Sequence, residues 1–225
     1  MDILKRKYFS WHLASSMVIV TTIGLTCQFL WFPTPFLQID GTWFALLILA
    51  AVDITLGPLL TLLLVSSKKS TGELVVDMFV IVAIQISALS YGLMQIERER
   101  VWAIVHLDGA FNLVTKKEIP NLQLIAKQEL PQYHGIYYAM VLNSDLPIHT
   151  ETSNHPLLYS PERFQFITKQ AMKSSEFPYQ KLPTNVQEKY NTDYIFNVLA
   201  GKRHNAVLVL DNNMKLIDIL LLPKK

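Results

Sequence analysis

Three long apolar segments dominate the first 96 residues of the chain. They run from Trp11 to Phe32, from Trp43 to Val65 and from Leu74 to Ile96. Each holds 22 or 23 residues, which as a helix is enough to cross a hydrocarbon core about 30 Å thick. The pattern therefore predicts three transmembrane helices at residues 11–32, 43–65 and 74–96, after a short N-terminal stretch at residues 1–10.

The scarcity of charge in this part of the chain also favours a membrane location. Charged residues make up 17% of the sequence, against roughly 25% in soluble domains. Residues 8–96 contain six charged side chains, namely Asp40, Asp53, Lys68, Lys69, Glu73 and Asp77. The basic residues 5–7 resemble the start of a cleaved signal, but the first segment ends without the small residues that cleavage needs. We expect a retained anchor in the lipid bilayer.

Basic residues near the ends of the segments predict the orientation. Three precede the first segment, none lies in the loop 33–42, and two lie in the loop 66–73. Cytoplasmic loops carry the excess of Lys and Arg, so we expect a cytoplasmic N-terminus and residues 97–225 outside the cytoplasm. Arg98 and Arg100, beside the third segment, argue the other way. Five aromatic residues around the loop 33–42 are expected to form a belt at the outer interface: Trp31, Phe32, Phe36, Trp43 and Phe44.

Residues 97–225 have ordinary polarity and the length of one small domain. Val101–Leu107 and Phe111–Thr115 flank Asp108-Gly109, which readily supplies the positive φ angles of a tight hairpin turn. Ala206–Leu210 and Lys215–Leu222 predict a second hairpin, and Gly135–Leu142 a further strand. The predicted fold class is a three-helix membrane anchor followed by a small α+β domain, at 97–225, with an antiparallel sheet.

Two segments of this domain carry signals for helix starts. Ser160-Pro161-Glu162 combines a capping hydroxyl, a proline for the first turn and an acid near the positive end of the helix dipole. Phe164, Ile167, Ala171 and Met172 would then share one helix face. Thr184 and Gln187 have the spacing of a capping box for a second, short helix.

Asp53 is the most informative residue of the apolar part. It lies ten residues after Trp43, roughly 15 Å into the second segment and so near the bilayer midplane. Gln85 lies at the same depth in the third segment. A charge at this depth must face protein or water and have a partner, or be protonated. Asp53 could bond Gln85 and fix helix packing, or receive a polar group from a partner helix, and the two interpretations are compatible.

Small residues cluster near Asp53 and suggest a place for close helix contact. Gly57 follows four residues later on the same face and leaves a notch where another backbone could approach. Pro58 removes a backbone donor and predicts a kink. On the third segment Ala83, Ser87, Ala88 and Gly92 add small contacts, which could instead serve packing within this chain.

The remaining residues argue against several classes of function. The net charge of +2 gives no indication of nucleic-acid binding, and one cysteine, Cys27, excludes a disulfide within the chain. Six histidines show no paired ligand spacing, so we expect no metal and no other cofactor. The sequence has no nucleophile elbow and no glycine-rich phosphate loop. We see no catalytic constellation in residues 97–225.

Several of these segments resemble one known family. Trp31–Phe36 leading to Asp40-Gly41, Val52–Leu62 with its Asp-x-x-Leu-Gly-Pro-Leu-Leu-Thr run, and Gln85–Gly92 resemble the type IV pilin accessory proteins of the TfpX/TfpZ (FimB-like) family. Val101–Val114 continues the similarity, which covers about residues 8–115. Arg100-Val101 departs from the arginine and proline expected there, and from about residue 120 only size and α+β character match.

The resemblance implies a bacterial inner-membrane protein that helps its cognate major type IV pilin accumulate and enter the pilus, with other inner-membrane assembly proteins as further candidate partners. It implies no enzymatic activity. We hypothesise that Asp53, Gly57, Pro58, Gln85, Ser87 and Gly92 form a groove for the pilin's membrane helix. The sheet of the domain, or an exposed edge strand, would contact the pilin head. Asp53 could act protonated, as a donor to the pilin's carboxylate, or ionised, as a partner of its N-terminal amine.

Two other classes of function compete with this hypothesis. One is a membrane-anchored sensor whose periplasmic domain binds a small ligand. The predicted cytoplasmic parts, about ten N-terminal residues and the loop 66–73, are too short for an output domain, so a sensor would need a separate partner. The other class is a membrane enzyme that modifies pilin with sugar, for which we would expect clustered acids at the outer face, where only Asp40 is available.

Overall fold

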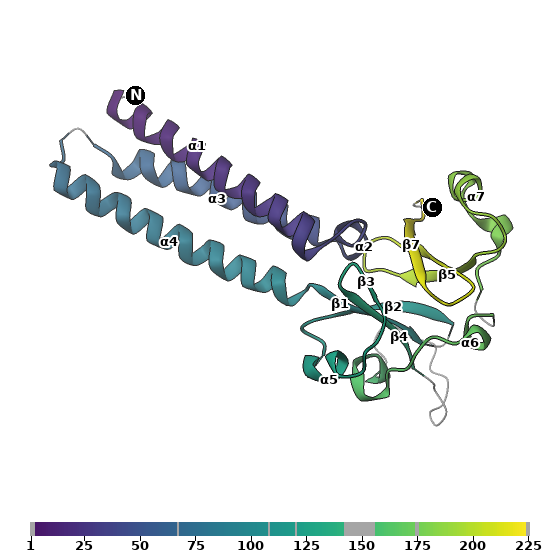
Figure 1. Cartoon of the computed structure of the whole chain (residues 1–225). Coiled ribbons are helices and arrows are strands. Elements are labelled where there is room, and N and C mark those ends of the chain that lie inside the picture. Colours follow the sequence, from purple (N-terminus) through teal and green to yellow (C-terminus); the bar gives the residue numbers. More distant parts are fainter. Residues whose placement is uncertain are drawn as a thin grey trace. The chain divides into compact units, whose positions relative to one another are not determined.

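The computed structural model describes residues 3–66, 68–107, 109–119, 121–141, 156–173 and 176–223. The chain divides into two compact units (Figure 1). The first comprises Met1–Trp31 and Thr42–Glu97, and the second comprises Phe32–Gly41 and Arg98–Lys225. The chain therefore passes between the units three times.

The first unit consists of three long helices. They are α1 (Ile3–Thr26), which continues into the π-helical turn η1 (Cys27–Trp31), α3 (Thr42–Leu64) and α4 (Thr71–Arg98). All three are long and apolar enough to cross a membrane, which confirms the prediction of three such helices. The first begins at Ile3, eight residues before the apolar segment itself.

The outer surface of these helices suits contact with lipid. Large apolar side chains such as Leu63 and Phe79 are 76% and 72% exposed. Four hydroxyls on the helices donate to the carbonyl four residues back in the same helix, at 2.6 to 2.8 Å: those of Thr22, Thr26, Thr55 and Ser87. These polar groups are satisfied within their own helix, as a hydrocarbon environment requires.

Within the described residues, the second unit is built on a seven-stranded sheet in the order β3-β4-β1-β2-β5-β6-β7. The strands are β1 (Val101–Leu107), β2 (Ala110–Thr115), β3 (Gln132–Tyr133), β4 (Ile136–Met140), β5 (Ile195–Ala200), β6 (Ala206–Leu210) and β7 (Leu216–Leu221). Four neighbouring pairs are antiparallel, whereas β1–β4 and β2–β5 are parallel. The mostly antiparallel sheet confirms the predicted fold class, but the two parallel pairs and the strands β3 and β5 were not predicted.

Both predicted hairpins are present. In the first, Leu107 lies opposite Ala110, and Gly109 has a φ of +92°. Asp108, the other residue of the predicted turn, lies outside the described residues. In the second hairpin, Leu210 pairs with Leu216. The local sequence pattern was therefore sufficient to predict both hairpins.

The sheet is covered on both faces. Alternate residues of β6 enter different apolar clusters: Ala206, Leu208 and Leu210 lie in one, Val207 and Val209 in another. Short helical segments provide the covering layers. They are α2 (Phe36–Asp40), α5 (Leu122–Ala126), α6 (Lys169–Lys173), α7 (Thr184–Lys189) and the 3-10 turns η3 (Pro156–Tyr159), η4 (Pro161–Arg163) and η5 (Tyr179–Lys181). Burial on two sides explains why β6 is a continuous apolar run.

The prediction of one helix starting at Ser160 was wrong. The segment forms only the turn η4, then extends so that Gln165 pairs with Met140, and becomes helical again at α6. The physical reason is that Phe164 packs in one apolar cluster, whereas Ile167 and Met172 pack in another. A single helix face cannot reach both.

The second predicted helix exists as α7, but the capping box was wrong. Thr184 is the first helical residue and the cap position is Pro183, without a side-chain capping bond. The side-chain amide of Gln187 instead donates to the carbonyls of Tyr179 and Leu182, at 3.2 and 2.8 Å. It thereby ties α7 to the turn η5 before it.

The loop between α1 and α3 belongs to the core of the second unit. Phe36 and Ile39 of α2 are fully buried in the main apolar cluster, with strand residues such as Ile104 and Leu208. Phe32 is also fully buried, whereas Trp43 and Phe44 are 43% and 49% exposed. The predicted aromatic belt was therefore wrong for Phe32 and Phe36, because these rings pack into protein.

Backbone contacts hold α2 against the turn between β5 and β6. The carbonyl of Ile39 accepts from the backbone N–H groups of Arg203 and His204, at 3.0 and 3.4 Å. A Cβ at Gly201 would collide with Ile39 and with the carbonyl of His204. This position needs glycine because two backbones approach each other here.

An ionic cluster reinforces the same contact. Lys202 Nζ lies 3.4 Å from Asp40 Oδ1 and 3.1 Å from Glu99 Oε2, and Lys117 Nζ lies 3.0 Å from Glu99 Oε1. Partial burial acts to raise the pKa of Glu99, but the hydrogen bonds from the two lysines outweigh it and lower that pKa. Glu99 thus links Lys117, which follows β2, to Lys202 in the turn between β5 and β6.

The sheet curls so that strands far apart in the order meet. The backbone N–H of Leu216, in β7, donates to Tyr138 Oη, in β4, at 3.4 Å. Asp218 of β7 also accepts from Lys189 Nζ and Tyr190 Oη at 2.7 Å each. Part of β7, which is an edge strand in the order, is therefore already engaged by β4 and the end of α7.

Candidate functional site

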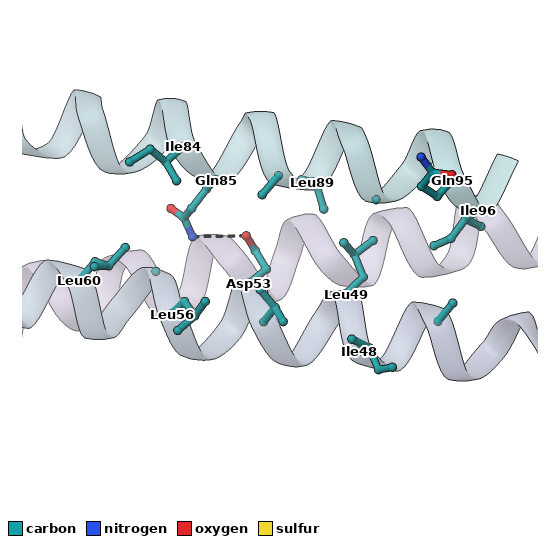
Figure 2. Close-up of a pocket in the computed structure, with 15 residues that line it drawn as sticks. Ile48, Leu49, Asp53, Leu56, Leu60, Ile84, Gln85, Leu89, Gln95 and Ile96 are labelled. Atoms are coloured by element: carbon teal, nitrogen blue, oxygen red, sulfur yellow. Dashed lines mark hydrogen bonds between the residues drawn. The ribbon is translucent and has the colours of Figure 1, made fainter. Parts of the chain in front are cut away.

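Asp53 and Gln85 meet at the middle of the helix bundle. Gln85 Nε2, from α4, donates to Asp53 Oδ1, from α3, at 3.3 Å. This confirms the hydrogen bond expected from their equal depth. Both side chains are partly buried, and Figure 2 shows them pointing toward each other across the space between the two helices.

His12 and Thr61 extend this contact into a network across all three helices. His12, from α1, places Nε2 at 2.6 Å from Gln85 Oε1 and Nδ1 at 2.6 Å from Thr61 Oγ1. Thr61 in turn donates to the carbonyl of Gly57 at 3.0 Å. The path from Asp53 to Thr61 thus passes through Gln85 and His12 by hydrogen bonds alone.

Sequence reasoning missed both of these residues. His12 is the second residue of the first apolar segment, and α1 begins nine residues earlier, at Ile3. Thr61 lies eight residues after Asp53, with Gly57 between them, so the three share one helix face. That spacing was the available signal for Thr61. No pattern in α1 pairs His12 with Gln85.

Gly57 makes the network possible. A Cβ at this position would collide with the Gln85 amide and lie 3.0 Å from His12 Nε2. The notch expected beside Gly57 is therefore occupied by two side chains of this chain. Pro58 is buried inside α3, which continues as a helix to Leu64.

An apolar groove of about 380 Å³ runs between α3 and α4 beside this network (Figure 2). Its α3 wall comprises Ala45, Ile48, Leu49, Val52, Asp53, Leu56, Gly57 and Leu60, and its α4 wall Ile84, Gln85, Ala88, Leu89, Gly92, Gln95 and Ile96. A second groove, of about 350 Å³, lies mainly between α1 and α4 and is also lined by Asp53 and Gln85. The Asp53–Gln85 pair therefore borders both grooves.

Four of the six site residues expected from the sequence line the first groove. They are Asp53, Gly57, Gln85 and Gly92. Gly92 leaves room for Leu49, whose Cδ1 would lie 2.6 Å from a Cβ at that position. Ser87 is exposed and its hydroxyl donates to the carbonyl of Ala83, and neither Ser87 nor Pro58 is among the lining residues.

The chemistry of this site suits binding. A charge at the centre of a membrane helix costs about 2.5 to 3.5 kcal/mol on insertion scales, so such residues usually face a partner or a functional path. Within the described residues, no three His, Cys, Asp or Glu side chains gather as a metal-binding group. An apolar groove with one carboxylate is suited to hold an apolar ligand that carries a single polar group.

Curated proteins similar to this chain are fimbrial assembly proteins of Dichelobacter nodosus. The proteins of serogroups E1 and I are 29% and 28% identical over 127 residues, which are 56% of this chain and 49% of each relative. The protein of serogroups C1 and C2 is 29% identical over 121 residues, which are 54% of this chain and 88% of that relative. The chain thus spans about half the length of two of these relatives. No family model and no solved structure matches it.

Proposed function

We propose that this protein is an inner-membrane accessory protein of type IV pilus assembly, which binds its cognate major pilin and promotes pilin stability and assembly in the manner of a chaperone. Similarity to fimbrial assembly proteins over about half of the chain supports the process. Three apolar helices support the membrane location. In this proposal the N-terminus is cytoplasmic and the sheet unit periplasmic.

The groove between α3 and α4 is the observation that carries the proposal. It is walled by apolar side chains along two helices and contains one carboxylate near the middle. Lipid tails could fill the apolar part but offer no donor to Asp53. A transmembrane helix can supply both apolar packing and a polar group at that depth. The membrane helix of the pilin is the occupant we propose.

The second unit would contact the globular part of the pilin and supply selectivity between pilins. Strand addition at β7 is the less favourable mode for this contact, because Tyr138 and Asp218 already join β7 to β4 and α7. A face of the unit formed by its covering segments is the better candidate.

Site-specific photo-crosslinking in cells tests this function. The crosslinking residue replaces Ile48 or Ala88, which line the groove on α3 and α4, and as a control Leu63, which is 76% exposed on α3 and is not among the lining residues. The proposal expects crosslinks to pilin from the first two positions and not from Leu63. It also expects loss of surface pili when the protein is deleted.

The opposite result has a defined meaning. Unchanged pilin levels and pili in the deletion strain, together with no pilin crosslinks from Ile48 or Ala88, would refute a role in pilin handling. The sensor hypothesis would then be next, and the second unit would be screened for small ligands. Asp53→Asn separates the two modes of groove binding: unchanged pilin accumulation would exclude a mechanism that needs an ionised Asp53.

A further inference from the structure

The hydrogen-bonding groups around His12 define which protons the network holds. Thr61 has one hydroxyl proton, which it donates to the carbonyl of Gly57 at 3.0 Å, so its oxygen faces His12 Nδ1 as an acceptor. Gln85 turns its Nε2 donor to Asp53 and therefore turns Oε1, which can only accept, to His12 Nε2. Both ring nitrogens of His12 thus face acceptors at 2.6 Å.

Only a histidine with two N–H groups satisfies both contacts. A neutral imidazole carries one N–H, whereas the imidazolium carries two. The Asp53 oxygen that accepts from Gln85 is consistent with a carboxylate. The pair then has no net charge, which suits a site inside a membrane.

We propose that His12 is the counter-ion of Asp53: it carries the positive charge that balances the carboxylate within the membrane, and the Gln85 amide joins the two. Among the described residues of the three helices, no other charged side chain is as well placed. Residues 42–64 of α3 contain Asp53 as their only charged residue, and α4 has no ionisable side chain between Asp77 and Tyr91. On α1 the ionisable groups on the same face as His12 are Tyr8, which lines the same groove, and Lys5, which donates to the carbonyl of Leu62 at 3.1 Å. Arg6 and Lys7 are exposed.

This pairing also determines which polar group a helix bound in the groove must carry, an inference that rests on the proposed function. Asp53 Oδ1 accepts from Gln85, while Oδ2 has no hydrogen-bond partner among the described residues. An ionised Asp53 that borders an apolar groove can only accept hydrogen bonds. The occupant is therefore a transmembrane helix that presents a donor at this depth, such as an amine, amide or hydroxyl, and not a carboxylate.

Two other proton arrangements give neutral histidine and are distinguishable by experiment. If Thr61 turned its proton from Gly57 to His12, the histidine would need only one N–H, and Asp53 would have no counter-charge. If the Gln85 amide were reversed, a protonated Asp53 would donate to Oε1 and Nε2 would donate to a neutral His12. The protonation state of His12 therefore decides between the proposal and both alternatives.

Nitrogen NMR of the full-length protein in lipid nanodiscs at pH 7 reads this state directly. The chain is labelled with ¹⁵N-histidine, and the His12 signals are identified by their absence in His12→Gln. The proposal expects both His12 nitrogens to show the N–H pattern of imidazolium. It expects Asp53→Asn to convert them to the pattern of one protonated and one bare nitrogen.

A matched control tests whether the His12 signals depend on Asp53 in particular. Asp77→Asn removes a carboxylate of α4 that pairs with Lys69 and not with His12, and should leave the His12 signals unchanged. A neutral pattern in the wild-type protein would overturn the proposal, as would an imidazolium pattern that persists in Asp53→Asn. The NMR experiment contains no pilin, so its result does not depend on the proposed function. If the imidazolium pattern is present but pilin crosslinks from the groove are absent, only the proposed function is refuted.

Discussion

The Gly57→Ala substitution adds one methyl group at the point where α1, α3 and α4 meet. Its Cβ would overlap the Gln85 amide and press on His12. Gln85 would have to move, and its bonds to Asp53 and His12 would break. The substitution therefore disrupts the network without removing any of its hydrogen-bonding groups.

The size of the effect follows from the bonds that are lost. Interhelical hydrogen bonds in membranes average about 0.6 kcal/mol and reach about 1.7 kcal/mol, so losing two of them costs about 1 to 3 kcal/mol. Alanine also favours the helix over glycine by up to about 1 kcal/mol, which would hide part of the loss. Gly24→Ala, in α1, corrects for this gain because a Cβ there has nothing within 4 Å.

The assay is unfolding of the full-length protein in mixed micelles as the fraction of denaturing detergent rises, followed by helical circular dichroism. We expect Gly57→Ala to be less stable than Gly24→Ala by about 1 to 3 kcal/mol. Gly92→Ala should fall between the two, because the atom that it meets is the flexible end of Leu49. Equal stability of Gly57→Ala and Gly24→Ala, to within about 0.5 kcal/mol, would show that the network does not hold the helices together.

Two further predictions concern the sheet unit. Phe36→Ala should destabilise this unit by about 3 to 5 kcal/mol, because the ring is fully buried. Phe29→Ala is the control and should have little effect, because that ring is 74% exposed on the first helix. Thermal unfolding followed by the circular dichroism of the sheet measures both variants, and equal effects would contradict the burial of Phe36. Partial burial acts to raise the pKa of Asp218, but hydrogen bonds from Lys189 and Tyr190 outweigh it and hold that pKa below its ordinary value. The contribution of Asp218 to stability is therefore present above about pH 4 and is lost as the pH falls through the lowered pKa. Hydrogen exchange in α7 and β7 should be faster in Asp218→Asn than in the wild type at pH 7. The stability difference between the two proteins, derived from these exchange rates, should shrink below pH 4. A stability difference that does not depend on pH would argue against the ion pair.

The sequence predicted the elements that depend on local pattern and on length. Apolar length alone located three helices, and counting depth from their ends brought Asp53 to Gln85 correctly. His12 could not be found in this way, because its contacts depend on how α1 is placed and rotated against the other helices. A lone histidine near the end of an apolar segment looks the same whether it faces lipid, water or a partner.

Predictions for the sheet unit failed where the residues of one segment pack into different parts of the core. Phe164, Ile167 and Met172 have the spacing of a helix face, but they pack into two clusters, and this long-range demand overrides the local helix signal. Strand β5 contains Asn197 within an apolar run and pairs in parallel with β2, a contact between residues more than eighty positions apart. Neither feature leaves a local signature.

The loop 33–42 shows how one pattern can fit two environments. Phe36 and Ile39 are three residues apart, as on one face of a short helix, and such a face can lie at a membrane interface or enter a protein core. The structure places it in the core, where Ile39 also bonds the turn between β5 and β6. A boundary drawn from hydropathy alone at residue 97 would cut Phe36 and Ile39 away from the cluster that they fill. The second unit is therefore completed by a segment that the chain supplies between two membrane helices, so the anchor contributes to the fold of the domain as well as to its attachment.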